Sequence, residues 1–287
     1  MKSLMRSATQ TLGKAEIRRP VWTAEQLLAS QLGCLPLDLH LENPKVLPEQ
    51  AVWFRSDVAA RANGVPLQYL LGSAAFYGRE FSVGPGVFIP RPETEILIDV
   101  ILNVVASLAS GGAKQSLTDP PTVVDIGTGS GAIALTLALE RPGLRLFGVD
   151  FSWQALTFAR GNAARHQGSI GWIQGDLLRC LRPGSVDLLI ANLPYLDPAQ
   201  SPEWPRELAW EPWLALDGGK GGVERIEQLL EQAHSVVRPR GQVVLEIGMG
   251  QAETVAGFSS GKGFLVEKRI SDLAGMDRVM VLRRVGS

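Results

Sequence analysis

Cysteine and histidine are scarce in this 287-residue sequence. Its two cysteines, Cys34 and Cys180, lie far apart and form no CxxC pair, and its three histidines show no metal-ligand spacing. Such low cysteine usage argues against a disulfide framework and a cysteine-ligated zinc site, and it is typical of a reducing compartment. We therefore predict a cytoplasmic chain that holds no metal and folds without covalent crosslinks.

The sequence also lacks a long apolar run and an excess of charge of one sign. Its most apolar stretch, Ile96 to Leu108, is interrupted by Asp99 and Asn103 and falls short of the ~18–20 apolar residues that span a bilayer. Lys and Arg number 28 against 29 for Asp and Glu, a formal net charge of -1. This balance argues against binding of nucleic acid through a broad basic surface. We expect a monomer without membrane or direct nucleic-acid contacts.

The first third of the chain predicts a small helical domain. Apolar residues recur at helical spacing between Leu4 and Ala15, which favours a folded helix over a basic transit peptide. The pair Thr23 and Gln26 has the spacing of a capping box, so a second helix is predicted to start there. A further helix is predicted from Glu49 to Ala62.

A change of pattern near residue 75 divides the chain. Glycines and prolines interleave with apolar residues from Ala75 to Ile89, which predicts a β-hairpin. The length suggests about two domains, at roughly 150 residues each. We therefore expect a helical domain at residues 1–72, a hairpin linker at 73–90 and a larger domain at 91–287.

Strand-like and helix-like segments alternate in the larger domain. Short apolar strands are separated by amphipathic or apolar helices, and Ser110 to Pro121 reads as a surface loop. Alternation of this kind predicts an α/β fold, a mainly parallel sheet with helices on both faces, whose ligands bind beyond the carboxyl ends of the strands. The predicted strands are Thr122–Ile126, Leu144–Val149, Ile170–Gln174, Val186–Ala191, Gln242–Ile247, Phe264–Ile270 and Arg278–Leu282.

Three of these strands end in residues suited to an adenosine group. Glycines in the turn after the first strand allow a close backbone approach to a ligand. Asp150 ends the second strand and can accept both ribose hydroxyls, while Asp176 and Leu177 follow the third and can bind the adenine amino group and ring. These features predict an adenosine cofactor. The first turn consists of Asp125, Ile126, Gly127, Thr128, Gly129, Ser130 and Gly131.

The glycine turn alone leaves the cofactor open. Gly127, Gly129 and Ala132 satisfy the dinucleotide fingerprint, so a nicotinamide or flavin dinucleotide is an alternative at this point. Asp125 two residues before the first glycine, together with the additional Gly131, favours S-adenosylmethionine.

The fourth strand runs into Asn192, Leu193, Pro194 and Tyr195. An Asn-x-Pro sequence is also an ordinary turn. In the context of an S-adenosylmethionine site, however, the Asn192 oxygen and the Leu193 carbonyl can each accept one N–H of an NH₂ group and aim its lone pair at a methyl carbon. Pro194 restricts the Leu193 backbone, and Tyr195 can stack on a flat substrate group. The pattern favours methylation of an amide or amino nitrogen.

Together the glycine turn and the Asn192 motif resemble the N5-glutamine methyltransferases that modify peptide chain release factors, the PrmC/HemK family. The resemblance covers nearly the whole chain. One departure is Leu193, where the family often has a proline; its carbonyl remains available, but the backbone is less rigid. The other similar segments are Leu4–Gly33, Pro66–Gly72, Phe88–Glu95, Glu211-Pro212 and Gly241–Gly248.

The resemblance implies S-adenosylmethionine as cofactor and, as substrate, the glutamine in the Gly-Gly-Gln loop of a class 1 release factor. It implies that the helical domain docks the release factor, and that Asn192 also contacts the cofactor. An ion pair and cap at the start of the next helix is the alternative role for Arg91 and Glu95. The implied substrate-binding residues are Phe88, Pro90, Arg91, Glu95, Asn192, Pro194 and Tyr195, and the implied catalytic residues are Asn192, Leu193, Pro194 and Tyr195.

Three other functions fit parts of the pattern. Amino methylation of adenine in DNA or RNA would suit the same Asn192 geometry, although the charge balance argues against it. A nicotinamide-dependent oxidoreductase would explain the glycines but leaves the Asn192 motif without a role. A binding module without activity would require a degenerate site, whereas every element of the site is present.

Overall fold

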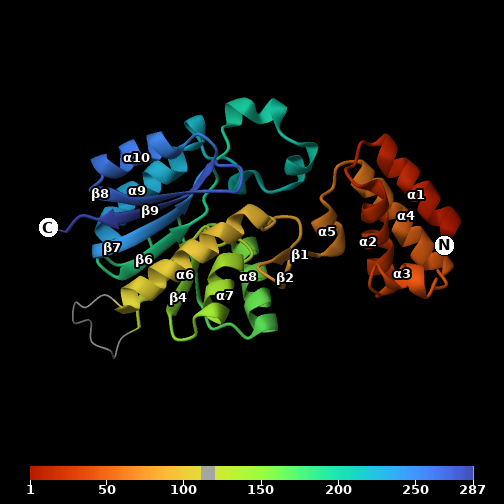
Figure 1. Cartoon of the computed structure of the whole chain (residues 1–287), viewed down its shortest axis with the longest axis horizontal. Helices are drawn as coiled ribbons and strands as arrows, with labels where there is room; N and C mark the ends of the chain where they lie inside the picture. Colours follow the sequence, from red (N-terminus) through yellow and green to blue (C-terminus); the bar gives the residue numbers. More distant parts are fainter. Residues whose placement is uncertain (111–119, 287) are drawn as a thin grey trace. The chain divides into compact units, whose positions relative to one another are not determined.

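The computed structural model describes residues 1–110 and 120–286, so the predicted loop at 110–121 lies largely outside the described residues (Figure 1). Two compact units are formed, and each combines segments that are distant in the sequence. The first unit is Met1–Ala74 with Val83–Pro85 and Pro205–Trp210, and the second consists of Ala75–Ser82, Gly86–Trp204 and the chain from Glu211 onward.

This division differs from the expected ranges in two ways. The predicted linker at residues 73–90 is shared between the two units and is no separate body. The segment Pro205–Trp210 belongs with the N-terminal helices, because Glu207 forms an ion pair with Arg61, whose guanidinium also donates to the Val65 carbonyl at 3.1 Å.

Helices build most of the first unit. Residues Ala8 and Leu12 of the first helix are buried, as the helical spacing predicts, and they pack with Leu28 and Phe54 in one core. Within residues 1–110 and 120–286, no helix has both the length and the apolar character needed to cross a membrane. The helices are α1 (Lys2–Lys14), α2 (Pro20–Leu32), α3 (Asp38–Leu41), α4 (Pro48–Ala62) and α5 (Leu67–Leu71).

The predicted start of α2 at Thr23 is wrong. The helix begins at Pro20, whose fixed φ and missing N–H suit a first helical turn, and Thr23 lies inside the helix with 2% of its surface exposed. A buried side chain one turn into a helix cannot cap its free N–H groups. Gly33 ends the helix with a φ of 65°, as expected.

The hairpin is shorter than predicted. It consists of β1 (Ser73–Phe76) and β2 (Arg79–Ser82), joined through Tyr77 and Gly78 with positive φ values of 48° and 71°. Such values are typical of the two-residue turns that match the twist of paired strands. The remainder of the predicted hairpin, up to Ile89, forms no strand, although Val83, Val87 and Ile89 are buried.

A seven-stranded sheet forms the centre of the second unit and confirms the α/β prediction, with the order β5-β4-β3-β6-β7-β9-β8. The first five strands in this order are parallel, and β9 is antiparallel to both of its neighbours. The strands are β3 (Thr122–Ile126), β4 (Arg145–Asp150), β5 (Gly171–Gln174), β6 (Val186–Ala191), β7 (Val237–Glu246), β8 (Phe264–Ser271) and β9 (Asp277–Arg284).

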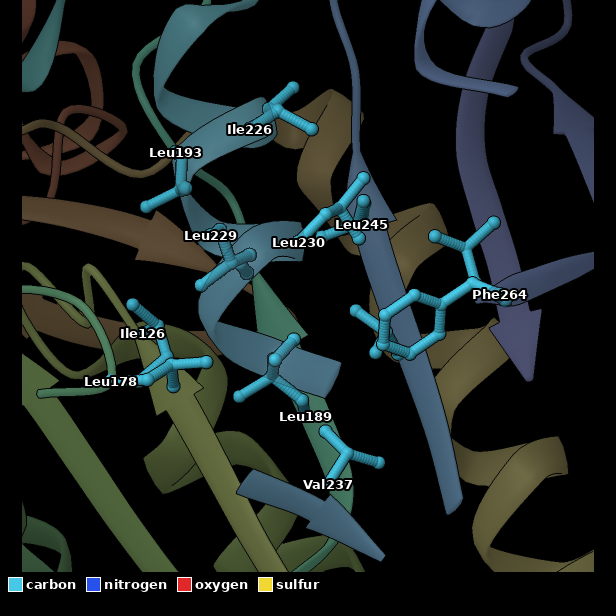
Figure 2. Packing of buried hydrophobic residues seen from close by; sticks show 14 of the residues in the cluster. Ile126, Leu178, Leu189, Leu193, Ile226, Leu229, Leu230, Val237, Leu245 and Phe264 are labelled. Atoms are coloured by element: carbon cyan, nitrogen blue, oxygen red, sulfur yellow. The ribbon is translucent and has the colours of Figure 1, made fainter. Parts of the chain in front are cut away.

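Helices pack on both faces of this sheet, because the side chains of each buried strand alternate between two cores. Val124 and Ile126 of β3 belong to the core that contains α9 and α10, whereas Val123 belongs to the core that contains α6 and α7. Figure 2 shows the first core, with Leu229 and Leu230 of α9 packed over the strands. The helices are α6 (Glu95–Ser110), α7 (Ala132–Glu140), α8 (Trp153–His166), α9 (Glu224–Val236) and α10 (Ala252–Gly261).

The order of the strands determines where a ligand can bind. The chain passes from β3 outward to β4 and β5, and then returns to the other side of β3 with β6. The loops that follow β3 and β6 therefore run in opposite directions from the carboxyl ends of these two strands. The crevice between such loops is the usual ligand position in sheets of this kind. The glycine turn and the Asn192 motif follow these two strands.

Candidate active site

The glycine turn between β3 and α7 needs glycine for its backbone. Gly127, Gly129 and Gly131 have φ values of 71°, 56° and 78°, in the left-handed region that side chains disfavour. A Cβ on Gly131 would lie 3.0 Å from the Trp172 ring, whereas one on Gly129 would meet only the Gly127 carbonyl, at 3.9 Å. The turn is thus packed at Gly131 and open at Gly129, where a ligand can approach the backbone.

Asp150 ties the end of β4 to this turn. One carboxylate oxygen accepts the Gly129 N–H at 2.8 Å, and the other accepts the Ser152 N–H at 2.8 Å. Burial raises the pKa of Asp150, and these hydrogen bonds act in the opposite direction. Because each carboxylate oxygen has two lone pairs, Asp150 keeps the capacity to accept ribose hydroxyls. Ser152 caps α8 as predicted, since its Oγ accepts the Ala155 N–H at 3.1 Å.

The structure places Asp125 beneath the turn. Its side chain is fully buried and accepts the Thr128 hydroxyl at 2.6 Å. Burial raises the pKa of Asp125 to about 7, against the hydrogen bonds from Thr128 and the Ala134 backbone, while the Asp150 charge raises it further. Asp125 therefore supports the turn from within. Ser130 is held in a similar way, because its carbonyl accepts the buried Asn162 amide at 2.9 Å.

Asp176 and Leu177 follow β5, the strand next to β4. Gln174 pairs with Asp150 in register, so Asp176 lies two residues beyond the level of Asp150. Asp176 forms an ion pair with Arg179 at 3.1 Å. Sequence reasoning missed Phe151, whose ring is 62% exposed directly after Asp150. An exposed aromatic ring after a strand-ending carboxylate is a signal for a flat ligand that could have been used.

The Asn192 motif lies beside the glycine turn. Ile126 pairs with Ala191, so Gly127 and Asn192 are the next residues along neighbouring strands. A Cβ on Gly127 would lie 3.2 Å from Leu193 Cδ2. Leu193 is 5% exposed and packs into the core beneath α9, where Figure 2 labels it. Burial of this side chain anchors the loop at the position where the family often has a proline.

Asn192 is held by a side chain from the segment before α6. Its Nδ2 donates to the Thr94 hydroxyl at 3.1 Å, and Thr94 is buried at the end of the 3-10 helix Pro92–Thr94. Tyr195 has its pKa raised to about 12 by burial and by the nearby Glu246 charge, so its hydroxyl stays protonated. A neutral phenol suits stacking and hydrogen bonding rather than proton transfer.

The segment before α6 contacts the buried carboxylate of Glu211. Arg91 forms an ion pair with this buried carboxylate, which also accepts the Ile89 N–H at 3.1 Å. The Arg91 guanidinium lies 4.9 Å from the centre of the Phe88 ring. Phe88, Pro90 and Arg91 are partly exposed. The partner of Arg91 is thus Glu211, a residue that no local pattern could have assigned to it.

Glu95 lies against the hairpin. Its Oε1 accepts the Tyr77 N–H at 2.8 Å, in the turn between β1 and β2. This contact gives Glu95 a structural task, and its predicted contact with substrate stays a prediction. In the part of the chain that the structure describes, no group of three His, Cys, Asp or Glu side chains is arranged to hold a metal ion.

These residues fit S-adenosylmethionine. Asp150 has lone pairs free to accept ribose hydroxyls, the exposed Phe151 ring and the partly buried Leu177 are apolar, and the backbone at Gly129 is open. Asn192 lies at the end of the neighbouring strand.

Similar proteins share this architecture. The PrmC N-terminal domain family matches residues 3–72, and the methyltransferase small domain family matches residues 114–204. Two solved structures, a ribosomal protein L11 methylase from Lactobacillus delbrueckii subsp. bulgaricus and a methyltransferase from Pyrococcus furiosus, superpose with TM-scores of 0.50 and 0.51 at 19% and 18% identity. Each covers 74% of this chain, with 89% and 91% of its own length. They share the fold of the sheet.

Curated relatives extend over almost the entire chain. A release factor glutamine methyltransferase from Nitratidesulfovibrio vulgaris is 38% identical and covers 99% of this chain and 95% of its own length. Another, from Moorella thermoacetica, is 36% identical and covers 99% and 98%. Likeness of this extent includes the helical unit as well as the sheet and its loops, and the chain therefore belongs to the release factor glutamine methyltransferase family.

Proposed function

We propose that this protein transfers the methyl group of S-adenosylmethionine to the side-chain amide nitrogen of the glutamine in the Gly-Gly-Gln loop of class 1 release factors. One observation carries the proposal: Asn192 lies beside the glycine turn, with its Nδ2 already bound to Thr94. The names of the full-length relatives support the same substrate. The protein acts in the cytoplasm, as a monomer, and without direct contact to nucleic acid.

The donor supplies an activated methyl group, and the residues of this chain bind and orient both reactants. Asp150 binds the ribose, Asp176, Leu177 and Phe151 surround the adenine, and the glycine turn accommodates the amino-acid end. Asp125 and Thr128 keep the turn in shape from beneath.

An amide nitrogen is a poor nucleophile because its lone pair is delocalised. Asn192 Oδ1 and the Leu193 carbonyl each accept one N–H of the substrate amide, which fixes the nitrogen and increases its electron density. Tyr195 remains neutral and stacks on the amide plane. The proton leaves readily once the nitrogen carries the methyl group, so the reaction requires no base before transfer.

The helical unit docks the release factor. Its surface exposes apolar side chains in the N-terminal halves of α2 and α4, among them Trp22, Val52 and Trp53, with 46%, 60% and 63% exposure. We expect Trp53→Ser to raise the KM for release factor while leaving the Kd for S-adenosylmethionine unchanged. Leu265→Ser, at an apolar position of 51% exposure in the sheet unit, is the matched control.

The decisive experiment maps the methyl group. Purified protein is incubated with labelled S-adenosylmethionine and either release factor or nucleic acid, and the labelled product is digested and mapped. Label on the Gly-Gly-Gln glutamine, lost in Asn192→Ala, supports the proposal. Label on nucleic acid, or an unlabelled release factor, overturns it. If the protein bound a nicotinamide dinucleotide more tightly than S-adenosylmethionine in a binding assay, the assignment of S-adenosylmethionine as the methyl donor would be wrong.

Two variants distinguish the residues proposed to bind the cofactor from those proposed to orient the substrate. Asp150→Ala is expected to weaken binding of S-adenosylmethionine, because ribose acceptors and the link to Gly129 are lost together. Asn192→Ala is expected to lower turnover chiefly. Equal losses of cofactor affinity in both variants would contradict these assignments.

A further inference from the structure

A buried carboxylate lies next to Asn192 and has no part in the chemistry described above. Glu246 ends β7, the neighbour of β6, and Ala191 pairs with Leu245 in parallel register. Asn192 and Glu246 are therefore the next residues along two adjacent strands. The Glu246 side chain is buried, with 4% exposure, at the edge of the sheet where the ligand site lies.

Hydrogen bonds connect Glu246 to the group that holds Asn192. Thr94 and Asn192 face the Glu246 carboxylate, and hydrogen bonding from both side chains lowers its pKa. Thr94 also accepts the Asn192 Nδ2 N–H at 3.1 Å. Since an ionised carboxylate can only accept, the Thr94 hydroxyl donates to Glu246 and presents its lone pairs to Asn192.

This arrangement decides which way the Asn192 amide faces. An asparagine amide can rotate by half a turn, which exchanges its oxygen and its nitrogen. With Nδ2 toward Thr94 and Glu246, both of its N–H groups find acceptors. The rotated amide would place Oδ1 against a carboxylate and against oxygen lone pairs, which is repulsive.

We propose that Glu246 is a positioning residue that orients the Asn192 amide through Thr94 and holds Oδ1 toward the substrate. The proposal rests on the proposed function, in which Oδ1 accepts an N–H of the substrate glutamine. A role in stability alone explains the carboxylate poorly, because Glu246 Oε2 is buried without a hydrogen-bond partner in the described structure. An unsatisfied buried acceptor destabilises the folded state.

The charge of Glu246 is sensitive to pH near neutrality. Burial raises its pKa to about 7, while the Thr94 hydrogen bond, the Arg278 charge on β9 and the Asn192 hydrogen bond lower it. The charge of Glu93, in the 3-10 helix Pro92–Thr94, raises the pKa of Glu246. Tyr195 faces Glu246 as a neutral phenol. Arg278 also forms an ion pair with Asp272, with 3.0 Å between Arg278 Nε and Asp272 Oδ2.

Protonation of Glu246 removes the orientation. A carboxylic acid gains an O–H donor, which can bind Asn192 Oδ1 or the Thr94 oxygen, and the two amide orientations then become similar in energy. Turnover should therefore rise with pH through about 7, as Glu246 loses its proton.

The test compares pH profiles of kcat in the full-length protein. We expect the wild type to show a rise with an apparent pKa of about 7. Glu246→Gln should lack this rise and turn over about tenfold more slowly than the wild type at pH 8, as expected for loss of a positioned catalytic contact. Its Kd for S-adenosylmethionine should stay within about twofold of the wild type, because Glu246 is not among the residues proposed to bind the cofactor. The matched control Glu253→Gln, at a carboxylate with 84% side-chain exposure, should keep the wild-type profile.

A second variant and a second readout keep the test independent of folding and of substrate. Thr94→Val should remove most of the rise, because the Thr94 hydroxyl is the link through which Glu246 orients the Asn192 amide. The ¹⁵N resonance of the Asn192 side chain, assigned by its loss in Asn192→Ala, should titrate near pH 7 in wild type and stay constant in Glu246→Gln.

Two failures can be told apart. A wild type that leaves the release factor unmethylated defeats the proposed function, while the Asn192 resonance still reports on Glu246. A wild-type enzyme that methylates release factor, but whose pH profile persists in Glu246→Gln, overturns the positioning role. An Asn192 resonance that does not titrate overturns it as well.

Discussion

The glycine turn and the Asn192 loop follow neighbouring strands, yet they are stabilised in different ways. The turn owes its shape to three positive φ angles and to carboxylates at the ends of its own and the next strand, Asp125 and Asp150. The side chain of Asn192 is instead held by a residue far away in the sequence, Thr94 before α6. The glycine turn is thus stabilised by residues of two adjacent strands, whereas Asn192 is held by Thr94, 98 residues away in the sequence.

The largest expected effect lies at Asn192, the proposed hydrogen-bond acceptor for the substrate amide. Asn192→Ala should lower kcat by about 10²- to 10³-fold, because an acceptor aimed at the reacting nitrogen is lost. The Kd for S-adenosylmethionine, measured by calorimetry, should change little. A loss confined to cofactor affinity would show that the Asn192 loop belongs to the cofactor half of the site.

The anchor of the same loop should matter for folding. Leu193→Ala removes a buried side chain beneath α9 and should lower the free energy of unfolding by about 2–4 kcal/mol, measured by urea denaturation. Leu214→Ala, at a position of 47% exposure, is the control and should cost less than about 1 kcal/mol. Equal costs would mean that burial of Leu193 does not anchor the loop.

The carboxylate under the glycine turn should make stability depend on pH. The folded-state pKa of Asp125 is raised to about 7, so the folded protein retains a proton that the unfolded chain releases near pH 4. The free energy of unfolding should therefore fall as pH rises toward 7, with a slope of up to about 1.4 kcal/mol per pH unit for this group. Denaturation of Asp125→Asn at several pH values should show a smaller slope than wild type. An unchanged slope would assign the effect to other groups.

The smallest expected effect separates packing from backbone strain in the turn. Gly131→Ala and Gly143→Ala both place a side chain at positive φ, 78° and 99°. Only the Gly131 Cβ meets other atoms, Trp172 at 3.0 Å and Ala159 at 3.1 Å, while the Gly143 Cβ meets nothing within 4 Å. Gly131→Ala should therefore cost about 1 kcal/mol more in urea denaturation. Equal costs would mean that backbone strain alone, without side-chain packing, explains the requirement for glycine at position 131.

Local patterns predicted the elements around the site well. The bounds of β3 and β6 agree with the expected strands, and Ser152 caps α8 as its position suggests. Local patterns failed where a competing local or tertiary feature prevailed. Pro20 starts α2 in place of Thr23, whose side chain is buried in the helical core. Sequence spacing could not pair Arg91 with Glu211 or Arg61 with Glu207, because each pair joins segments more than a hundred residues apart.

The sequence by itself determined the alternation of strands and helices, the positive-φ glycines and the strand-ending carboxylates, since each depends on neighbouring residues and on the preferences of the backbone. Only the tertiary structure decided how the Asn192 amide is held. Thr94, Asn192 and Glu246 come from three segments of the chain, and they meet because the parallel register sets β6 beside β7 while α6 packs on the same sheet. A hydrogen bond between distant residues exists only after the sheet has formed, so no local preference encodes it.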